Sequence, residues 1–83
     1  MIIRVNTRKL VNTAQVVEFE VVANRPNYAI QADYEPKENT GEPKHITLFE
    51  SDSVEVCENV LLKLYKAFES GDTSFDMSRV AGA

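Results

Sequence analysis

Two residues of this chain, His45 and Cys57, carry side chains that could act together in nucleophilic catalysis. A nearby imidazole lowers the pKa of a thiol and favours the reactive thiolate. They are the only histidine and the only cysteine, and no group that would orient the imidazole is evident. Cys57 also follows Val54 on an apolar helical stripe, where a free thiol is typically a small buried hydrophobic group. The pattern therefore predicts a structural cysteine and no catalytic residue.

The sequence lacks the sets of residues that metal and phosphate sites usually need. A zinc site needs three or four ligands, which one histidine and one cysteine cannot supply. The carboxylates of Glu35, Glu38 and Glu42 do not follow the Asp-x-Asp-x-Asp-Gly pattern of calcium loops. The three glycines are dispersed, so they form no phosphate-binding loop. We therefore predict a protein that is not an enzyme and holds no metal or cofactor.

The charge of the chain is negative and unevenly distributed. The net charge is −4, which disfavours direct contact with nucleic acid or an anionic membrane. Basic residues prevail in residues 1 to 25 and acidic residues in 33 to 58. We expect the acidic segment to attract a protein partner, and a basic one in particular. The residues predicted to bind this partner are Glu35, Glu38, Glu42, Asp52, Glu55 and Glu58.

Alternation of apolar and polar residues predicts the strands that carry this surface. Residues 14 to 23 are rich in β-branched side chains and alternate with period two, which is typical of a half-buried strand. Pro26 between two asparagines predicts a turn, followed by a second strand over 28 to 34. Residues 35 to 43 predict a mobile loop, and 44 to 50 one more strand. A short strand over 2 to 5 and an irregular link complete the N-terminal part.

A helix is predicted over residues 52 to 70. Asp52 and Glu55 fit a capping box at its start, and Gly71 is well placed to end it. Apolar residues recur at intervals of three and four and predict the buried stripe. These residues are Val54, Cys57, Val60, Leu61, Leu64 and Phe68, and we expect several of them to pack on Val17, Phe19 and Val21. A short edge strand through Phe75 and Met77 is the last candidate element.

These elements predict one α+β domain over residues 1 to 77, with a flexible tail over 78 to 83. The expected fold is an antiparallel meander of three to four strands, with one helix packed on one face. A secreted domain of this size usually needs disulfides, which a single cysteine cannot form within the chain. No signal peptide or membrane-spanning stretch is recognisable. We expect a cytoplasmic monomer or homodimer that does not bind membranes.

The C-terminal half carries a resemblance. Residues 46 to 52, 60 to 71 and 75 to 77 follow one another as strand, capped helix, glycine and Phe-x-Met strand. This order is similar to that in small uncharacterised proteins of Gram-positive bacteria and their phages. The resemblance covers roughly the last 35 residues, implies the fold above and would suit a prophage origin. It implies no active residues, since none is known for these proteins.

Two functional hypotheses follow from the sequence. The first is a small accessory or phage-encoded module that binds a protein through its acidic region or through the sheet face away from the helix. The second is an acidic inhibitor that mimics nucleic acid and blocks a host defence nuclease, as anti-CRISPR and anti-restriction proteins do. In the second case, carboxylates between Asp33 and Glu58 would take the place of phosphates.

Overall fold

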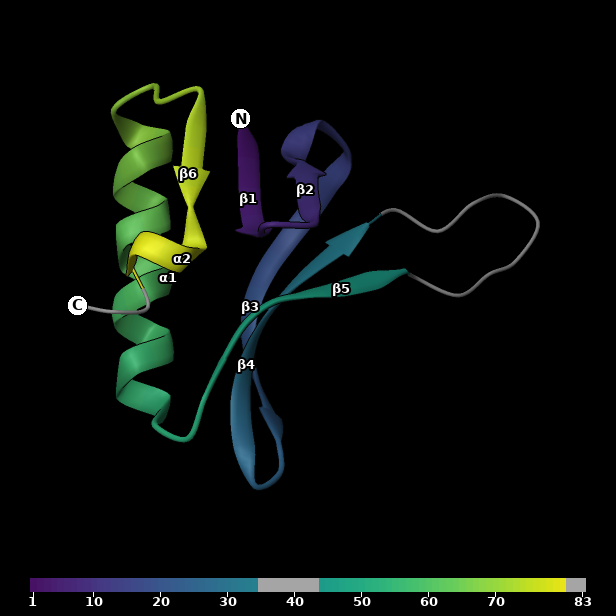
Figure 1. The fold of residues 1–83 in the computed structure, drawn as a ribbon, viewed down its shortest axis with the longest axis vertical. Coiled ribbons are helices and arrows are strands. Elements are labelled where there is room, and N and C mark those ends of the chain that lie inside the picture. Colours follow the sequence, from purple (N-terminus) through teal and green to yellow (C-terminus); the bar gives the residue numbers. More distant parts are fainter. Residues whose placement is uncertain (35–43, 81–83) are drawn as a thin grey trace.

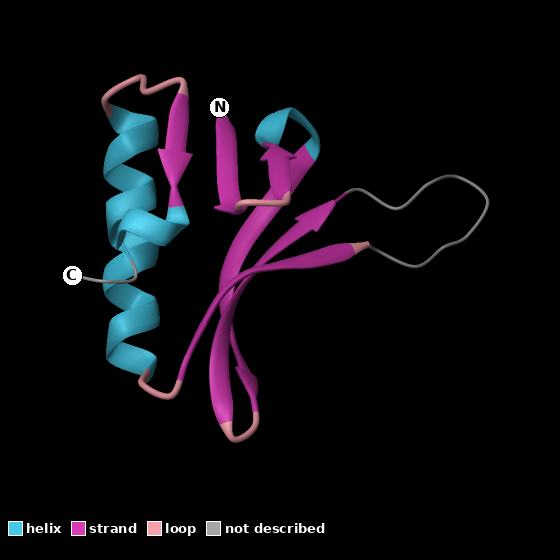
Figure 2. Ribbon diagram, viewed as in Figure 1, coloured by secondary structure: helices cyan, strands magenta, loops and turns pink. Residues whose placement is uncertain are grey.

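The computed structural model describes residues 1–34 and 44–80 of the chain. The helix α1 lies beside a twisted sheet, and the short helix α2 lies next to α1 (Figure 1). Figure 2 separates these helices from the strands by colour. The elements are β1 (Ile2–Asn6), β2 (Lys9–Asn12), a 3-10 turn (Thr13–Gln15), β3 (Val16–Asn24), β4 (Asn27–Tyr34), β5 (His45–Ser51), α1 (Val54–Glu69), β6 (Ser74–Asp76) and α2 (Met77–Val80).

The strands form two three-stranded sheets. One is the antiparallel meander β3-β4-β5, and the other has the order β2-β1-β6. The predicted α+β fold with one main helix on the sheet is confirmed. The first strand does not extend the meander, because β1 pairs with β2 antiparallel and with β6 in parallel. The turn or irregular link predicted before Leu10 leads into a further strand, β2, which begins at Lys9 and whose Val11 is buried.

The β3–β4 hairpin is the longest pairing among the described strands. Asn24 pairs with Asn27 across a two-residue turn, Arg25 and Pro26, whose connecting peptide bond is cis. A bulge between Val16 and Glu18 interrupts the register near the start of β3. A bulge inserts an extra residue and turns the strand locally. Val17 is therefore exposed, and the prediction that it packs under the helix is wrong.

Local capping fixes both ends of α1. Ser53 is the N-cap, and its hydroxyl accepts a hydrogen bond from the Val56 amide at 3.4 Å. The predicted capping box starting at Asp52 is wrong, because β5 runs on to Ser51 and leaves Asp52 in the link. At the other end, Gly71 adopts the left-handed conformation with φ 75°. The Asp72 amide bonds back to the Ala67 carbonyl, which completes a Schellman motif.

One apolar core joins both sheets and the helices. Its fully buried side chains include Ile3 from β1, Ile30 from β4 and Met77 from α2. The buried stripe of α1 consists of Cys57, Val60, Leu64 and Ala67. Val54 and Phe68, predicted to belong to it, are both partly exposed. The stripe that the sheet covers is thus narrower than the apolar arc of the helix.

The helix α2 spans the predicted end of the domain. The boundary expected after Met77 falls within α2, which continues to Val80, and Val80 packs against the core. Residues 81–83 lie outside the described part of the chain. Neither helix that the structure describes combines the length and the apolar composition needed to cross a membrane.

Asp76 anchors the start of α2. Its carboxylate accepts hydrogen bonds from the Ser78 amide at 2.9 Å and the Ser78 hydroxyl at 2.6 Å. Arg4 of β1 and Arg79 lie 3.8 Å and 3.9 Å from the same carboxylate. The Ser78 hydroxyl bond, with help from both arginines, lowers the pKa of Asp76 below its ordinary value. Asp76 therefore ties the C-terminal segment to β1.

Replacement of Asp76 should destabilise the fold in a pH-dependent manner. We expect Asp76→Ala to lower the midpoint of thermal unfolding at pH 7. The midpoint of Asp76→Asn should lie between those of the wild type and Asp76→Ala, because its amide oxygen still accepts a hydrogen bond from Ser78. Because the pKa of Asp76 is lower in the folded state than in the unfolded state, the ionised carboxylate stabilises the fold at pH values above the unfolded pKa. This stabilisation is lost as the pH falls through the folded pKa. The gap between wild type and Asp76→Asn should therefore close in melts below about pH 4. An equal loss in the exposed control Asp72→Asn would contradict this assignment.

Candidate functional site

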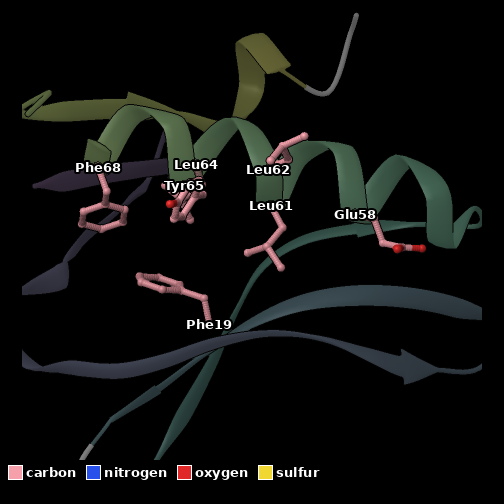
Figure 3. A pocket seen from close by; sticks show the side chains of 7 residues that line it. All are labelled: Phe19, Glu58, Leu61, Leu62, Leu64, Tyr65 and Phe68. Carbon is pink, nitrogen blue, oxygen red and sulfur yellow. The ribbon is translucent and has the colours of Figure 1, made fainter. Parts of the chain in front are cut away.

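An apolar groove runs between α1 and the edge strand β3. Its volume is about 520 Å³, and among the described residues Phe19 lines it from the sheet. Figure 3 shows Phe19 rising from β3 toward Phe68 and Tyr65 of the helix. The helical residues that line the groove are Glu58, Leu61, Leu62, Leu64, Tyr65 and Phe68. We refer to this feature as the α1–β3 groove.

The groove exists because α1 is apolar over a wider arc than the sheet covers. Leu61, Tyr65 and Phe68 are spaced by four and three residues, so they lie along one flank of the buried stripe. The Phe68 ring meets Phe19 at a centroid distance of 5.7 Å. Even so, Phe68 stays 42% exposed, Leu62 50% and Tyr65 61%. Large apolar side chains thus remain exposed beside one another.

The strand β3 borders the groove with an open backbone edge. It is a terminal strand of the β3-β4-β5 sheet, and among the described residues it pairs only with β4. In an antiparallel ladder, alternate residues direct their N–H and C=O groups away from the existing neighbour. The outer edge of β3 therefore offers backbone donors and acceptors next to an apolar surface.

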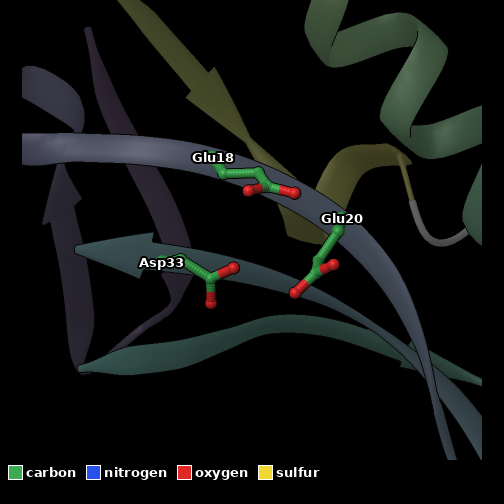
Figure 4. A group of neighbouring side chains, drawn as sticks. All are labelled: Glu18, Glu20 and Asp33. Carbon is green, nitrogen blue, oxygen red and sulfur yellow. The ribbon is translucent and has the colours of Figure 1, made fainter. Parts of the chain in front are cut away.

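The opposite face of β3 is acidic. Side chains alternate across a strand, so Glu18 and Glu20 lie on the face away from Phe19. Glu18 pairs with Asp33 of β4, and one carboxylate oxygen of each of the three residues lies within 4.8 Å of the others. Figure 4 shows the three side chains converging over β3 and β4. We call Glu18, Glu20 and Asp33 the acidic trio.

The surroundings of Glu20 in the acidic trio raise the pKa of its carboxyl group. A hydrogen bond shared with Asp33 is the main cause that raises the pKa of Glu20, and the charges of Asp33 and Glu18 add to it. His45 acts in the opposite direction. The Gln31 amide also donates to Asp33 at 3.0 Å. These carboxylates would accommodate a cationic group, although calcium prefers six to eight oxygen ligands and the trio alone provides three carboxylates.

Of the residues predicted to bind the partner, the structure describes three. Asp52, Glu55 and Glu58 are all exposed around the first turns of α1. Glu58 also lines the α1–β3 groove, so the structure brings one predicted residue to the candidate site. The loop residues Glu35, Glu38 and Glu42 lie outside the described residues.

The structure separates His45 from Cys57. His45 begins β5 and pairs with Asp33, whereas the Cys57 thiol donates to the Tyr28 carbonyl at 3.6 Å. Tyr28 pairs with Ser51 at the other end of β5, about 20 Å away at the usual rise per strand residue. Cys57 is fully buried, and burial raises the pKa of its thiol. This geometry does not support a Cys-His nucleophile.

Sequence reasoning missed the acidic trio, although a signal for it was present. A two-residue turn at Arg25 and Pro26 fixes the register of the hairpin, and counting back from it places Glu18 opposite Asp33. The groove carried no such signal. The apolar pattern assigns Phe68 to the buried stripe and leaves Leu62 and Tyr65 outside it, and the spacing does not show that these three side chains stay exposed beside one another.

Comparison with known proteins gives no relative for this chain: no family model, no curated protein and no solved structure matches it.

Proposed function

We propose that this protein is a non-enzymatic binding module that holds a partner protein in the α1–β3 groove. The carrying observation is the exposure of Leu62, Tyr65 and Phe68 beside one another around a concave surface. Contiguous apolar patches on a small domain typically mark interaction sites. Tyrosine and phenylalanine are also enriched in the cores of protein interfaces, where they bury a large area.

The acidic residues beside this surface favour a basic partner. Glu58 lines the groove, and Glu18 and Glu20 lie on the other face of β3. Opposite charges on a partner would steer its approach and penalise acidic competitors. An accessory or phage-encoded role, and a cytoplasmic location, belong to this proposal as predictions.

Changes in the groove should abolish capture of the partner without unfolding the protein. We expect Leu62→Ser with Tyr65→Ser to reduce recovery of the captured protein at least about tenfold, because both side chains would anchor the interface. Affinity capture from the native host, followed by mass spectrometry, measures this recovery. The two residues are largely exposed, so the melting temperature should change little.

Leu10→Ser is the matched control for this experiment. Leu10 is 68% exposed on β2, outside the groove, so its replacement removes an equally accessible apolar side chain. We expect this variant to capture the same protein as the wild type. Undiminished capture by the groove variant, or an equal loss in Leu10→Ser, would contradict the assignment of the groove as the binding site.

The alternative of a nucleic-acid mimic receives less support from the described carboxylates. A mimic needs negative charges spaced along a row, as the phosphates of a strand are. The acidic trio is instead a compact cluster with its oxygens within 4.8 Å. Asp52, in the link before α1, and Glu55, in the first turn of α1, lie on other parts of the chain. We therefore place the protein-binding module first.

A further inference from the structure

We propose that β3 binds an extended segment of the partner as an added antiparallel or parallel strand, in which apolar residues alternate with lysine or arginine. The apolar side chains of this segment enter the α1–β3 groove, and the basic side chains lie over the acidic trio. This inference rests on the proposed function and specifies its partner. Three features of β3 carry it: an open backbone edge, an apolar face and an acidic face.

The backbone edge provides the first requirement. β3 spans nine residues, Val16–Asn24, and its outer edge is unpaired within the described part of the chain. Natural proteins usually protect such an edge with lysine, proline or a covering segment, because it otherwise recruits further strands. An added strand would satisfy the outward N–H and C=O groups of β3.

The two faces of β3 select the side chains of that strand. Phe19 faces the groove, whereas Glu18 and Glu20 face the opposite side with Asp33. A bound strand alternates its side chains with the same period, so every second residue meets an apolar surface and the others meet carboxylates. An alternating basic and apolar segment is therefore complementary to both faces at once.

The acidic trio also argues against a second copy of this chain as the added strand. Antiparallel pairing of β3 with another β3, centred on Phe19 or Glu20, would set glutamates directly opposite one another. Like charges at opposite positions destabilise a strand pair. The raised pKa of Glu20 indicates that the trio is already crowded with negative charge. A lysine or arginine of a partner would reduce the repulsion among these carboxylates, whereas the acidic trio of a second copy would increase it.

The test uses a blocked heptapeptide that alternates lysine with valine and phenylalanine. We expect it to bind the full chain, to shift the backbone amide resonances of β3, and to slow hydrogen exchange along that strand. Glu18→Gln with Glu20→Gln should weaken binding at least about tenfold, because both charges lie on the contacted face. Glu69→Gln with Asp72→Asn removes the same charge at exposed positions outside the groove and the trio, and should leave the affinity unchanged.

Two peptide controls separate strand addition from simple charge attraction. One has the same composition with its lysines contiguous, and the other carries N-methyl groups on alternate amides, so it cannot complete a strand ladder. Neither should protect β3 from exchange. The inference is wrong if these peptides bind as well as the alternating one, or if the alternating peptide does not bind at millimolar concentration. Loss of partner capture in the groove variant together with no peptide binding would retain the binding module and refute only the added strand.

Discussion

Replacement of Leu64 with alanine should lower the free energy of unfolding by about 2–5 kcal/mol, as large-to-small changes in a core do. Leu64 is 1% exposed and lies in the core between α1 and the sheet. The loss combines the burial free energy of the removed methyl groups with the cavity left behind. Domains of this size are only marginally stable, so the change would remove a large share of the total stability.

Urea unfolding followed by circular dichroism measures the effect of this replacement. Leu62→Ala is the matched control, since the same atoms are removed from the same helix at a position that is 50% exposed. We expect the control to cost about 1 kcal/mol or less. A loss below about 0.5 kcal/mol for Leu64→Ala would place this side chain at the surface and refute the packing described here.

The second large effect concerns the reactivity of Cys57. The thiol is fully buried, and burial raises its pKa, so the folded protein presents almost no accessible thiolate. Labelling requires an opening that exposes the N-terminal part of α1. If this opening costs about 3–4 kcal/mol, the native protein reacts about 100 to 1,000 times more slowly than the denatured chain.

A thiol reagent added with and without denaturant compares the two rates for Cys57. The denatured chain is the internal control, since the same residue reacts in both samples. Rapid labelling of the native protein, together with loss of an activity in Cys57→Ser, would restore the enzyme hypothesis. Cys57→Ser should itself be less stable than the wild type, because the hydroxyl is more costly to bury than the thiol.

The parts of the fold that the sequence predicted are those determined by neighbouring residues. The period-two pattern and Pro26 predicted the β3–β4 hairpin, and the spacing of Cys57, Val60 and Leu64 predicted α1. The second sheet was not predicted, because β1 and β6 pair across almost the whole chain. A three-residue strand such as β6 has too few residues to show a period, so its partner depends on tertiary packing.

The candidate site was predicted less well than the fold. Charge counting selected Glu58, which lines the groove, but it overlooked Glu18 and Glu20 and their proximity to Asp33. Two of these residues are in a strand noted mainly for its valines, and they meet Asp33 only through hairpin register. Tyr65 was overlooked because the width of the apolar arc of a helix does not reveal how much of it a sheet will cover.

The parallel pairing of β1 with β6 has a consequence for the order of folding. It joins Ile2 to Ser74 and Arg4 to Asp76, positions about 70 residues apart, whereas the β3–β4 hairpin forms from adjacent segments. Contacts of such long range form slowly, because closing the intervening chain costs entropy before any contact repays it. We therefore expect the meander and α1 to assemble first on a growing chain. Ile3 can complete the core only when Met77 has left the ribosome, and until then the β1 edge stays open to misassembly.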